Sequence, residues 1–319
     1  MRLLHILIAT CGLLFGATGA AIAADDAADR TLAGDAACTR CHDQDEPKPV
    51  LSIYQTAHGV KADERTPVCQ SCHGASLKHI KNDAGLEIRP PVDISFARGS
   101  KANVAEEVQT CIACHKNGQR GHWDGSQHQA AGVSCNTCHT THVRRDPVLA
   151  KATQPEVCFA CHKTERAQMH KISTHPVAAG KMGCSDCHNP HGSTGPVQMR
   201  KASVNETCAS CHAEKRGPFL WEHEPVSEAC TNCHTPHGSN IGPLLKMRTP
   251  WLCQTCHSGD HGAEVNSGTN LRSGNRSTVN GKLSDATATP RIQMNGRNCT
   301  NCHFQTHGSN HPAGGKLTR

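Results

Sequence analysis

A largely apolar run lies near the start of the chain, from Leu3 to Phe15. The run follows a lone basic residue, Arg2, and gives way to small residues up to Ala23. This succession is typical of a secretory signal peptide. We therefore expect residues 1–23 to be a signal peptide, and the mature chain, residues 24–319, to be exported.

Beyond the leader the apolar residues are scattered, and no stretch approaches the roughly 20 apolar residues of a membrane-spanning helix. Short segments such as NVAEEVQTC, TQPEVC and SVNETC place acidic residues where helices begin. Turns rich in Gly and Pro separate them, and strand signals are almost absent. The pattern predicts a mostly irregular fold with short α-helices.

Large apolar side chains are too few to fill the interior of such a chain. Aromatic residues make up 3% of the sequence, and Tyr54 is its single tyrosine. A chain of this composition tends toward disorder unless something other than side chains forms the core. We therefore expect bound groups to fill the interior.

The cysteines indicate what those groups are. Of the 21 cysteines, all but Cys11 in the leader belong to the motif C-x-x-C-H, which occurs ten times and is intact in every copy. In chain order, the cysteine pairs of motifs one to ten are Cys38 and Cys41, Cys69 and Cys72, Cys111 and Cys114, Cys135 and Cys138, Cys158 and Cys161, Cys184 and Cys187, Cys208 and Cys211, Cys230 and Cys233, Cys253 and Cys256, and Cys299 and Cys302. The motif histidines are His42, His73, His115, His139, His162, His188, His212, His234, His257 and His303.

This spacing is the attachment signature of a c-type haem. Two thiols three residues apart lie on one side of a helical turn and can form thioethers to the two vinyl groups of one porphyrin. The next residue, a histidine, then lies under the ring and can bind the iron. A zinc site or a redox dithiol is the alternative for a single copy, and a disulfide framework the alternative for an exported chain. None of these needs the histidine ten times, so we predict ten covalently bound haem c groups.

Further histidines match the number of irons. After each even-numbered motif comes one histidine, and before four of the five even-numbered motifs comes another; His261, after motif nine, is the best substitute for the missing one. The ten predicted second ligands are His58, His79, His128, His142, His175, His191, His223, His237, His261 and His307. His122, His170 and His311 are left as spares, and His170 is the alternative to His175.

A histidine three residues beyond a motif histidine cannot reach the far face of the same porphyrin, because the ring is wider than the link. We therefore expect such residues to bind a neighbouring haem. Two imidazoles on every iron leave no open coordination position. A haem with two histidine ligands also has a lower reduction potential than one with a histidine and a methionine. The predicted haems pass electrons and bind no substrate, so no catalytic residue is expected.

The repeats define five two-haem modules in one decahaem domain, at about residues 35–100, 101–153, 154–203, 204–249 and 250–319. Self-similarity of this kind is typical of a stacked linear array. The stretch 264–298 interrupts the regular spacing; its Asn, Ser, Gly and Thr content indicates an exposed loop, either a tolerated insertion or a docking or metal-contact surface.

The formal net charge is +6 at pH 7. A ferric haem with two ionised propionates adds about one negative charge. Ten haems would make the holoprotein mildly acidic, so the charge gives no support for a nucleic-acid partner.

The ten motifs, the matching histidines and the CHxPHGS pattern resemble the MtrA, MtoA, PioA and DmsE family of decahaem cytochromes, over the whole mature chain. The pattern looks most like the iron-oxidising MtoA. The resemblance implies an elongated periplasmic cytochrome, associated with the outer membrane inside a porin-like β-barrel partner, with bis-histidine haems in a linear file. It also implies periplasmic or inner-membrane multihaem cytochromes as partners, and an extracellular cytochrome or extracellular iron on the far side.

Two other functions stay open. One is a free periplasmic electron shuttle without a barrel partner. The other is a multihaem reductase with one open iron, for which the last module is the candidate because it lacks the upstream histidine. The expected function is electron transfer rather than enzymatic catalysis.

Overall fold

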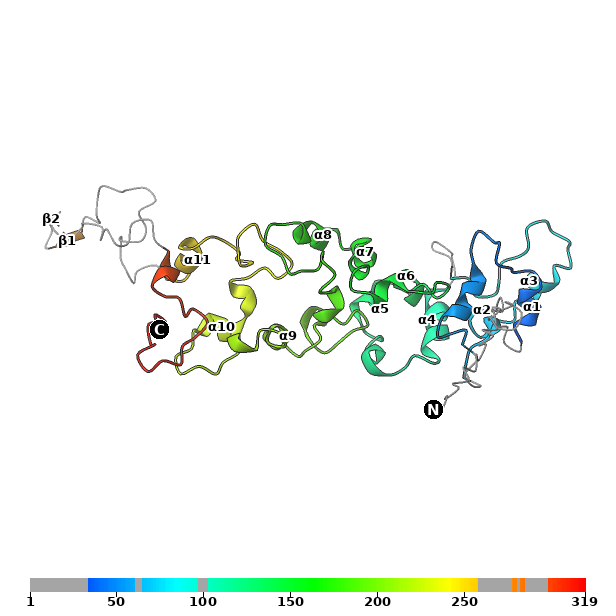
Figure 1. The fold of residues 1–319 in the computed structure, drawn as a ribbon, viewed down its shortest axis with the longest axis horizontal. Helices are drawn as coiled ribbons and strands as arrows, with labels where there is room; N and C mark the ends of the chain where they lie inside the picture. The colour runs from blue at the N-terminus through cyan, green and yellow to red at the C-terminus, as the bar shows by residue number, and fades with distance from the viewer. Residues whose placement is uncertain (1–33, 61–64, 97–102, 258–276, 280–281, 285–297) are drawn as a thin grey trace, which may run out of the picture.

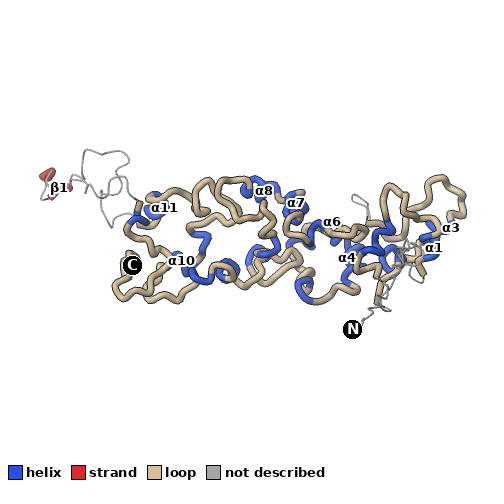
Figure 2. Tube along the Cα trace, viewed as in Figure 1, coloured by secondary structure: helices blue, strands red, loops and turns tan. Residues whose placement is uncertain are grey.

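The computed structural model describes residues 34–60, 65–96, 103–257, 277–279, 282–284 and 298–319. The expected signal peptide lies outside these residues. The described chain is elongated, and its elements follow one another along the long axis from α1 at one end to α11 at the other (Figure 1). Short helices are joined by long loops, as Figure 2 shows, so the expected irregular fold with short α-helices is confirmed.

The α-helices are α1 (Ala36–Thr39), α2 (Cys69–His73), α3 (Leu77–Lys81), α4 (Val104–Ile112), α5 (Gln127–Ala130), α6 (Cys135–Cys138), α7 (Gln154–Phe159), α8 (Lys163–Met169), α9 (Val204–Ala209), α10 (Glu224–Glu228) and α11 (Trp251–Gln254). The 3₁₀ helices are η2 (Val50–Gln55), η3 (Gly118–Arg120), η4 (Pro147–Leu149), η5 (Cys184–Asp186), η6 (Pro196–Gln198), η7 (Ala213–Lys215), η8 (Cys230–Asn232) and η10 (Cys299–Asn301).

Helix-start signals place the odd-numbered motifs. The Asn103 side chain accepts a hydrogen bond from Ala105 N at the start of α4, and the Ser203 side chain accepts one from Glu206 N at the start of α9. These caps satisfy backbone donors that have no partner within the helix. Helices α4, α7 and α9 each carry the first cysteine of an odd-numbered motif in their last turn. Even-numbered motifs differ, because their helices α2, α6, η5, η8 and η10 begin at the first cysteine.

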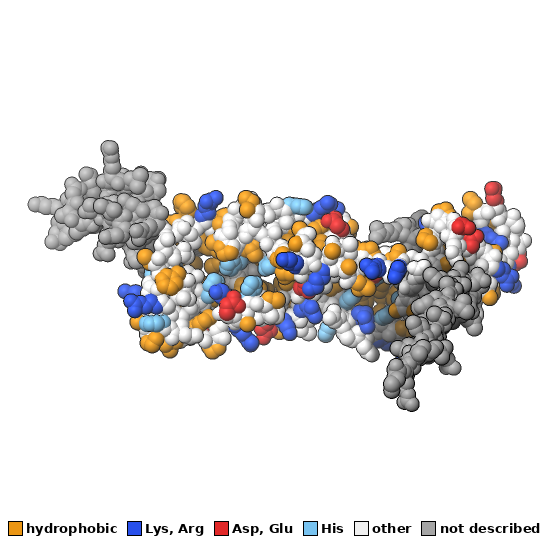
Figure 3. Space-filling model, in the orientation of Figure 1, with side chains coloured by type: hydrophobic (Ala, Val, Ile, Leu, Met, Phe, Trp, Pro, Cys, Tyr) orange, Lys and Arg blue, Asp and Glu red, His pale blue; other side chains and the backbone are white. Residues whose placement is uncertain are grey.

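The described side chains build almost no apolar core of their own. The buried hydrophobic residues are Tyr54, Val108, Trp123, Phe159, Val177 and Met199. Histidines instead gather in the hollowed middle of the molecule, while most Lys, Arg, Asp and Glu side chains lie on its outer surface (Figure 3). This distribution fits an interior filled by bound haem.

The stretch 264–298, expected to be a loop, contains a short antiparallel hairpin. Strands β1 (Ser277–Val279) and β2 (Lys282–Ser284) pair with Thr278 opposite Leu283. Two three-residue strands are too short to give a clear alternation of apolar and polar positions, so the sequence pattern did not reveal them. No helix among the described residues is long and apolar enough to cross a membrane.

Candidate haem sites

Within each expected module, the first cysteines of the two motifs lie against each other. The sulfur of Cys111 hydrogen-bonds that of Cys135, which raises the pKa of Cys111 and lowers that of Cys135 to about 7. The corresponding pairs in the other modules are Cys38 with Cys69, Cys158 with Cys184, Cys208 with Cys230, and Cys253 with Cys299. Thioether formation would remove these titrations, and the cysteines of the two motifs would hold the two haems of a module side by side.

Between modules, it is the second cysteine of the even-numbered motif that faces the next motif. Burial, and after it the charge of Cys114, raises the pKa of the Cys72 thiol, which shows that motifs two and three adjoin. The other junctions are Cys138 with Cys158, Cys187 with Cys211, and Cys233 with Cys256. The two kinds of contact alternate, so they link all ten motifs in chain order without a break.

Nine motif histidines each face a second imidazole across a gap. The ring centroids are 5.8 to 6.4 Å apart. The pairs are His42 with His79, His115 with His58, His73 with His142, His162 with His128, His139 with His191, His212 with His175, His188 with His237, His257 with His223, and His234 with His307.

This separation is the one that a six-coordinate haem iron requires. A bond from a metal to an imidazole nitrogen is about 2.0 Å, and a ring centroid lies about 1.2 Å from its nitrogen, so two imidazoles on opposite sides of one iron have centroids about 6.4 Å apart. The gap therefore fits one iron and the plane of one porphyrin.

Most of these imidazoles are fixed through their other nitrogen. The Nδ1 atom lies 2.6 to 3.0 Å from an acceptor oxygen in the following contacts: His42 with Glu46, His73 with Ile94, His79 with Pro90, His128 with Pro190, His139 with Asp146, His142 with Val50, His175 with Pro236, His188 with Val197, His223 with Thr306, His234 with Pro243, and His303 with Lys316. An Nδ1–H that donates in this way leaves Nε2 with a free lone pair, and it fixes the direction in which the ring points.

The repeated Pro-His-Gly segment holds the neighbouring module. Its first residue offers a carbonyl to an upstream histidine of the preceding module: His175 Nδ1 donates to Pro236 O at 2.9 Å. Its histidine, His237, faces His188 of that module. Its glycine, Gly238, has φ +148°, and a Cβ there would collide with the backbone oxygen of Gln168. The segment therefore requires glycine both for conformation and for space.

Burial keeps the candidate ligands neutral. It lowers the pKa of His73, His191, His237 and His307 below the ordinary value. Neutral imidazole is the form that binds a metal, because a protonated nitrogen has no lone pair to offer. The described residues contain no group of three or more His, Cys, Asp or Glu side chains arranged around a bare metal ion. The donor set is thus one of facing pairs, which fits haem iron.

The remaining histidines are placed as follows. His122, His170 and His311 are exposed and belong to none of the nine pairs, so the structure favours His175 over His170 as the partner in module three. His261 lies outside the described residues. Each of the five histidines beyond an even-numbered motif faces the histidine of a motif other than its own.

Sequence reasoning missed the acceptors that orient the rings. The carbonyls are backbone atoms and leave no residue-type signal. The two short carboxylate contacts, Glu46 on His42 and Asp146 on His139, lie four and seven residues after the histidine. An acidic residue shortly after a motif is the signal that could have indicated them, although the sequence alone does not separate such residues from solvated ones.

Comparison with known proteins agrees with these sites. Residues 128–167, 175–217 and 223–262 match the family described as a doubled CXXCH motif. Each matched stretch begins at an upstream histidine and joins an even-numbered motif to the odd-numbered motif that follows it. The repeat can thus be divided in either of two registers, as the alternating cysteine contacts also suggest.

Three relatives show sequence similarity over larger parts of the chain. The multiheme cytochrome MtrA of Shewanella baltica is 43% identical over 286 residues, which cover 88% of this chain and 80% of the relative. The cytochrome c-type protein NrfB of Haemophilus influenzae is 28% identical over 42% of this chain and 69% of its own. The nine-heme cytochrome c of Desulfovibrio desulfuricans is 22% identical over 48% of this chain and 58% of its own.

The sequence identity to MtrA extends over most of the chain, and it agrees with the facing imidazoles and adjoining motifs described above. The C-x-x-C-H motifs carry covalently bound haem c, and the haem irons transfer electrons. The chain belongs to the MtrA family of multihaem c-type cytochromes.

Proposed function

We propose that this protein is a decahaem electron conduit that crosses the outer membrane inside a β-barrel partner. It links periplasmic or inner-membrane multihaem cytochromes to an extracellular cytochrome, to extracellular iron or to another external donor or acceptor. The observation that carries the proposal is the unbroken succession of motif contacts, from Cys38 and Cys69 at one end to Cys253 and Cys299 at the other.

Each motif in this proposal binds one haem through its two cysteines and its histidine. The facing imidazole supplies the second axial ligand, so that ten irons are six-coordinate and none is open to substrate. Bound haem supplies a one-electron couple. The chain's own residues fix the ring orientations through Nδ1, exclude water from the file and hold successive porphyrins close together.

The two ends of the file need ligands of their own. Interior haems take their second histidine from a neighbouring module, whereas His42 takes His79 from its own module. By the same logic the last haem, at His303, takes a histidine from its own module. The sequence offers His261 between motifs nine and ten.

A barrel follows from the physics of the membrane. A bilayer with its headgroups is about 40 to 45 Å thick, and an elongated file of ten adjoining haems can exceed that. The described chain consists mostly of loops whose polar backbone groups cannot face lipid. A closed β-barrel around the cytochrome would satisfy both conditions. We accordingly place the protein in the periplasm, associated with the outer membrane through that partner.

Reconstitution tests the conduit. Liposomes that carry the cytochrome together with its barrel should pass electrons from an internal dye to an external acceptor. Liposomes with the barrel alone, and liposomes with the cytochrome alone, are the controls. Equal rates with and without the barrel would contradict the conduit and favour a free periplasmic shuttle.

Coordination at the last haem tests the ligand scheme. The pyridine haemochrome assay should give ten haems per chain, and electron paramagnetic resonance of the oxidised protein should show low-spin iron only. His261→Ala should convert one haem to the high-spin form without loss of covalent haem. His311→Ala is the matched control in the same module and should change nothing. High-spin iron in the unmodified protein would instead favour a reductase with an open site.

A further inference from the structure

The motif histidines of the even-numbered motifs share an arrangement with one exception. In each case Nδ1 donates to the segment that follows the motif. In four motifs the acceptor is a backbone carbonyl: Ile94 O for His73, Val197 O for His188, Pro243 O for His234 and Lys316 O for His303. In motif four the acceptor is a carboxylate, because Asp146 Oδ2 lies 2.6 Å from Nδ1 of His139. This is the shortest carboxylate contact on an imidazole among the described residues.

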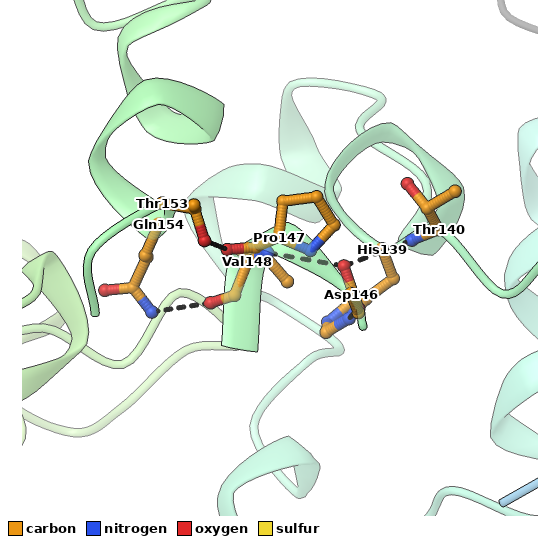
Figure 4. A network of polar contacts seen from close by, with 7 residues as sticks. All are labelled: His139, Thr140, Asp146, Pro147, Val148, Thr153 and Gln154. Atoms are coloured by element: carbon orange, nitrogen blue, oxygen red, sulfur yellow. Dashed lines mark hydrogen bonds and ion pairs between the residues drawn. The ribbon is translucent and has the colours of Figure 1, made fainter. Parts of the chain in front are cut away.

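Asp146 is held in place by its own turn, as Figure 4 shows. Its Oδ1 accepts from Thr140 N and from Val148 N, both at 3.3 Å, so the side chain caps η4. Thr153 Oγ1 donates to Pro147 O at 2.6 Å, which closes the turn from its other end. The Asp146 side chain is only 13% exposed. The backbone donors of its own turn therefore set its orientation.

The next module reinforces the turn. Gln154 is buried, and its Nε2 donates both to Val148 O at 2.8 Å and to Ser185 Oγ at 3.0 Å. Ser185 N donates back to Gln154 Oε1 at 3.0 Å. The carboxylate is thus part of a polar network that joins motif four to motif six.

We propose that Asp146 is a positioning residue that lowers the reduction potential of the haem bound by motif four, below that of the haems whose motif histidines donate to carbonyls. A carboxylate that accepts from Nδ1 makes the imidazole a stronger electron donor, and its negative charge favours the ferric over the ferrous state. The inference rests on the proposed ligation of that haem by His139 and His191.

On the opposite side of the same haem, no described residue accepts a hydrogen bond from the facing ring. This ring, His191, lies with its centroid 6.1 Å from that of His139, and its Nδ1 is buried without a hydrogen-bond partner among the described residues. Arg120, whose charge reaches His191, is exposed, and so are Arg144 and Arg145 next to Asp146, so solvent screens these positive charges. Motif four therefore combines one ligand bonded to a largely buried anion with one ligand that has no acceptor in the described part of the chain.

The chain supplies a graded series of comparisons. Glu46 lies 2.9 Å from Nδ1 of His42, but its side chain is 28% exposed. Glu165 lies 3.8 Å from Nδ1 of His162, beyond hydrogen-bond distance, and is 37% exposed. The influence of the carboxylate on the haem potential should decrease in the order Asp146, Glu46, Glu165, because both distance and solvent weaken it.

The experiment is a spectropotentiometric titration of the complete holoprotein and its variants. Asp146→Asn keeps the capping acceptor and removes the charge. It should raise the reduction potential of one haem in ten. The expected rise corresponds to a tenfold change in the ferric-to-ferrous ratio of that haem at a fixed potential, which is about 59 mV for one electron. Asp146→Glu should restore the low potential, Glu46→Gln should give a smaller rise, and Glu165→Gln should give none.

Haem content and low-spin resonance signals are recorded for each variant, to separate this inference from the proposed function. If the Asp146→Asn variant keeps its haem content and its low-spin signals and yet gives the same redox titration curve as Glu165→Gln, the inference about Asp146 is overturned, while the proposed ligation stands. High-spin iron at the motif-four haem of the unmodified protein would overturn the proposed ligation by His139 and His191. Near-infrared magnetic circular dichroism of the unmodified protein needs no variant: a minor charge-transfer band at higher energy than the rest is expected, and a single uniform band contradicts the proposal.

Discussion

The interior modules and the N-terminal module hold their haem sites in different ways. In the interior, Ser173 and Ser239 exchange two backbone hydrogen bonds of 2.8 and 2.9 Å, which join one module to the next. Trp221 and Ser309 repeat the same exchange one module further on. Each interior site is thus assembled from two modules, and a single module would leave its ligands without partners.

The N-terminal module contains a buried polar cluster of its own. Asp35 is 1% exposed; its Oδ2 accepts from the Tyr54 hydroxyl at 2.8 Å, and its Oδ1 accepts from Cys69 N at 2.7 Å. His79 faces His42 within this module, and its Nδ1 is held by Pro90 O. Buried polar side chains at the end of the file therefore replace contacts that a neighbour supplies elsewhere.

The difference shows where a repeat array is vulnerable. Interior stability depends on close backbone contact between neighbours, as in other arrays in which each repeat touches only the next. The N-terminal module also contacts module two, where Val50 O accepts from His142 Nδ1, but the hydrogen bonds of its Asp35 lie within the module itself. Substitutions in the two regions should therefore destabilise the protein in different ways.

The largest effect is expected where two interior modules touch. Gly238→Ala forces a Cβ against Gln168 O at a φ of +148°, so the module contact must open. We expect a loss of about 3 kcal/mol or more in the free energy of unfolding. Thermal unfolding of the holoprotein measures it. Gly85→Ala in the N-terminal module has φ +60° and nothing within 4 Å of the new Cβ, so it should cost only about 1 to 2 kcal/mol. Equal costs would contradict the comparison.

A smaller loss is expected at the end of the file. Asp35→Ala leaves the Tyr54 hydroxyl and Cys69 N without their buried acceptor, which should cost about 2 to 3 kcal/mol. Tyr54→Phe removes one donor and should cost less. Limited proteolysis should then cleave first near motif one, while the interior modules stay intact. Asp43→Ala, on an exposed residue of the same module, is the control. Cleavage spread evenly along the chain would argue against a separate end cluster.

The smallest effect in free energy is expected from exchange of one interior ligand. His237→Met should raise the potential of the haem at His188, because a methionine ligand favours ferrous iron over the histidine it replaces. A tenfold change in the ferric-to-ferrous ratio, about 59 mV, is the scale to look for in a redox titration. Covalent haem content should not change. The exposed His170→Ala serves as the control, and a titration curve identical to it would show that His237 is not a ligand.

Much of the candidate site could be predicted from the sequence, because its chemistry is local. Two cysteines and a histidine within five residues define one covalent anchor and one ligand wherever the segment lies, so the repeated motif carried the family and the kind of cofactor. The helix starts before Cys111 and Cys208 were likewise predictable, since the capping residues Asn103 and Ser203 act within one turn. The pairing of β1 with β2 was not, because each strand is too short for a periodic pattern.

Only the tertiary structure decided which histidines face each other and what holds them. His73 and His142 are separated by the whole of motifs three and four, and yet their centroids lie 6.1 Å apart. The oxygen atoms that orient the rings are mostly backbone carbonyls from distant segments, such as Val50 O for Nδ1 of His142. Residue type fixes what an imidazole or a thiol can bind, but the pairing of two imidazoles across one iron depends on how modules stack, and stacking is set by contacts between residues far apart in the chain.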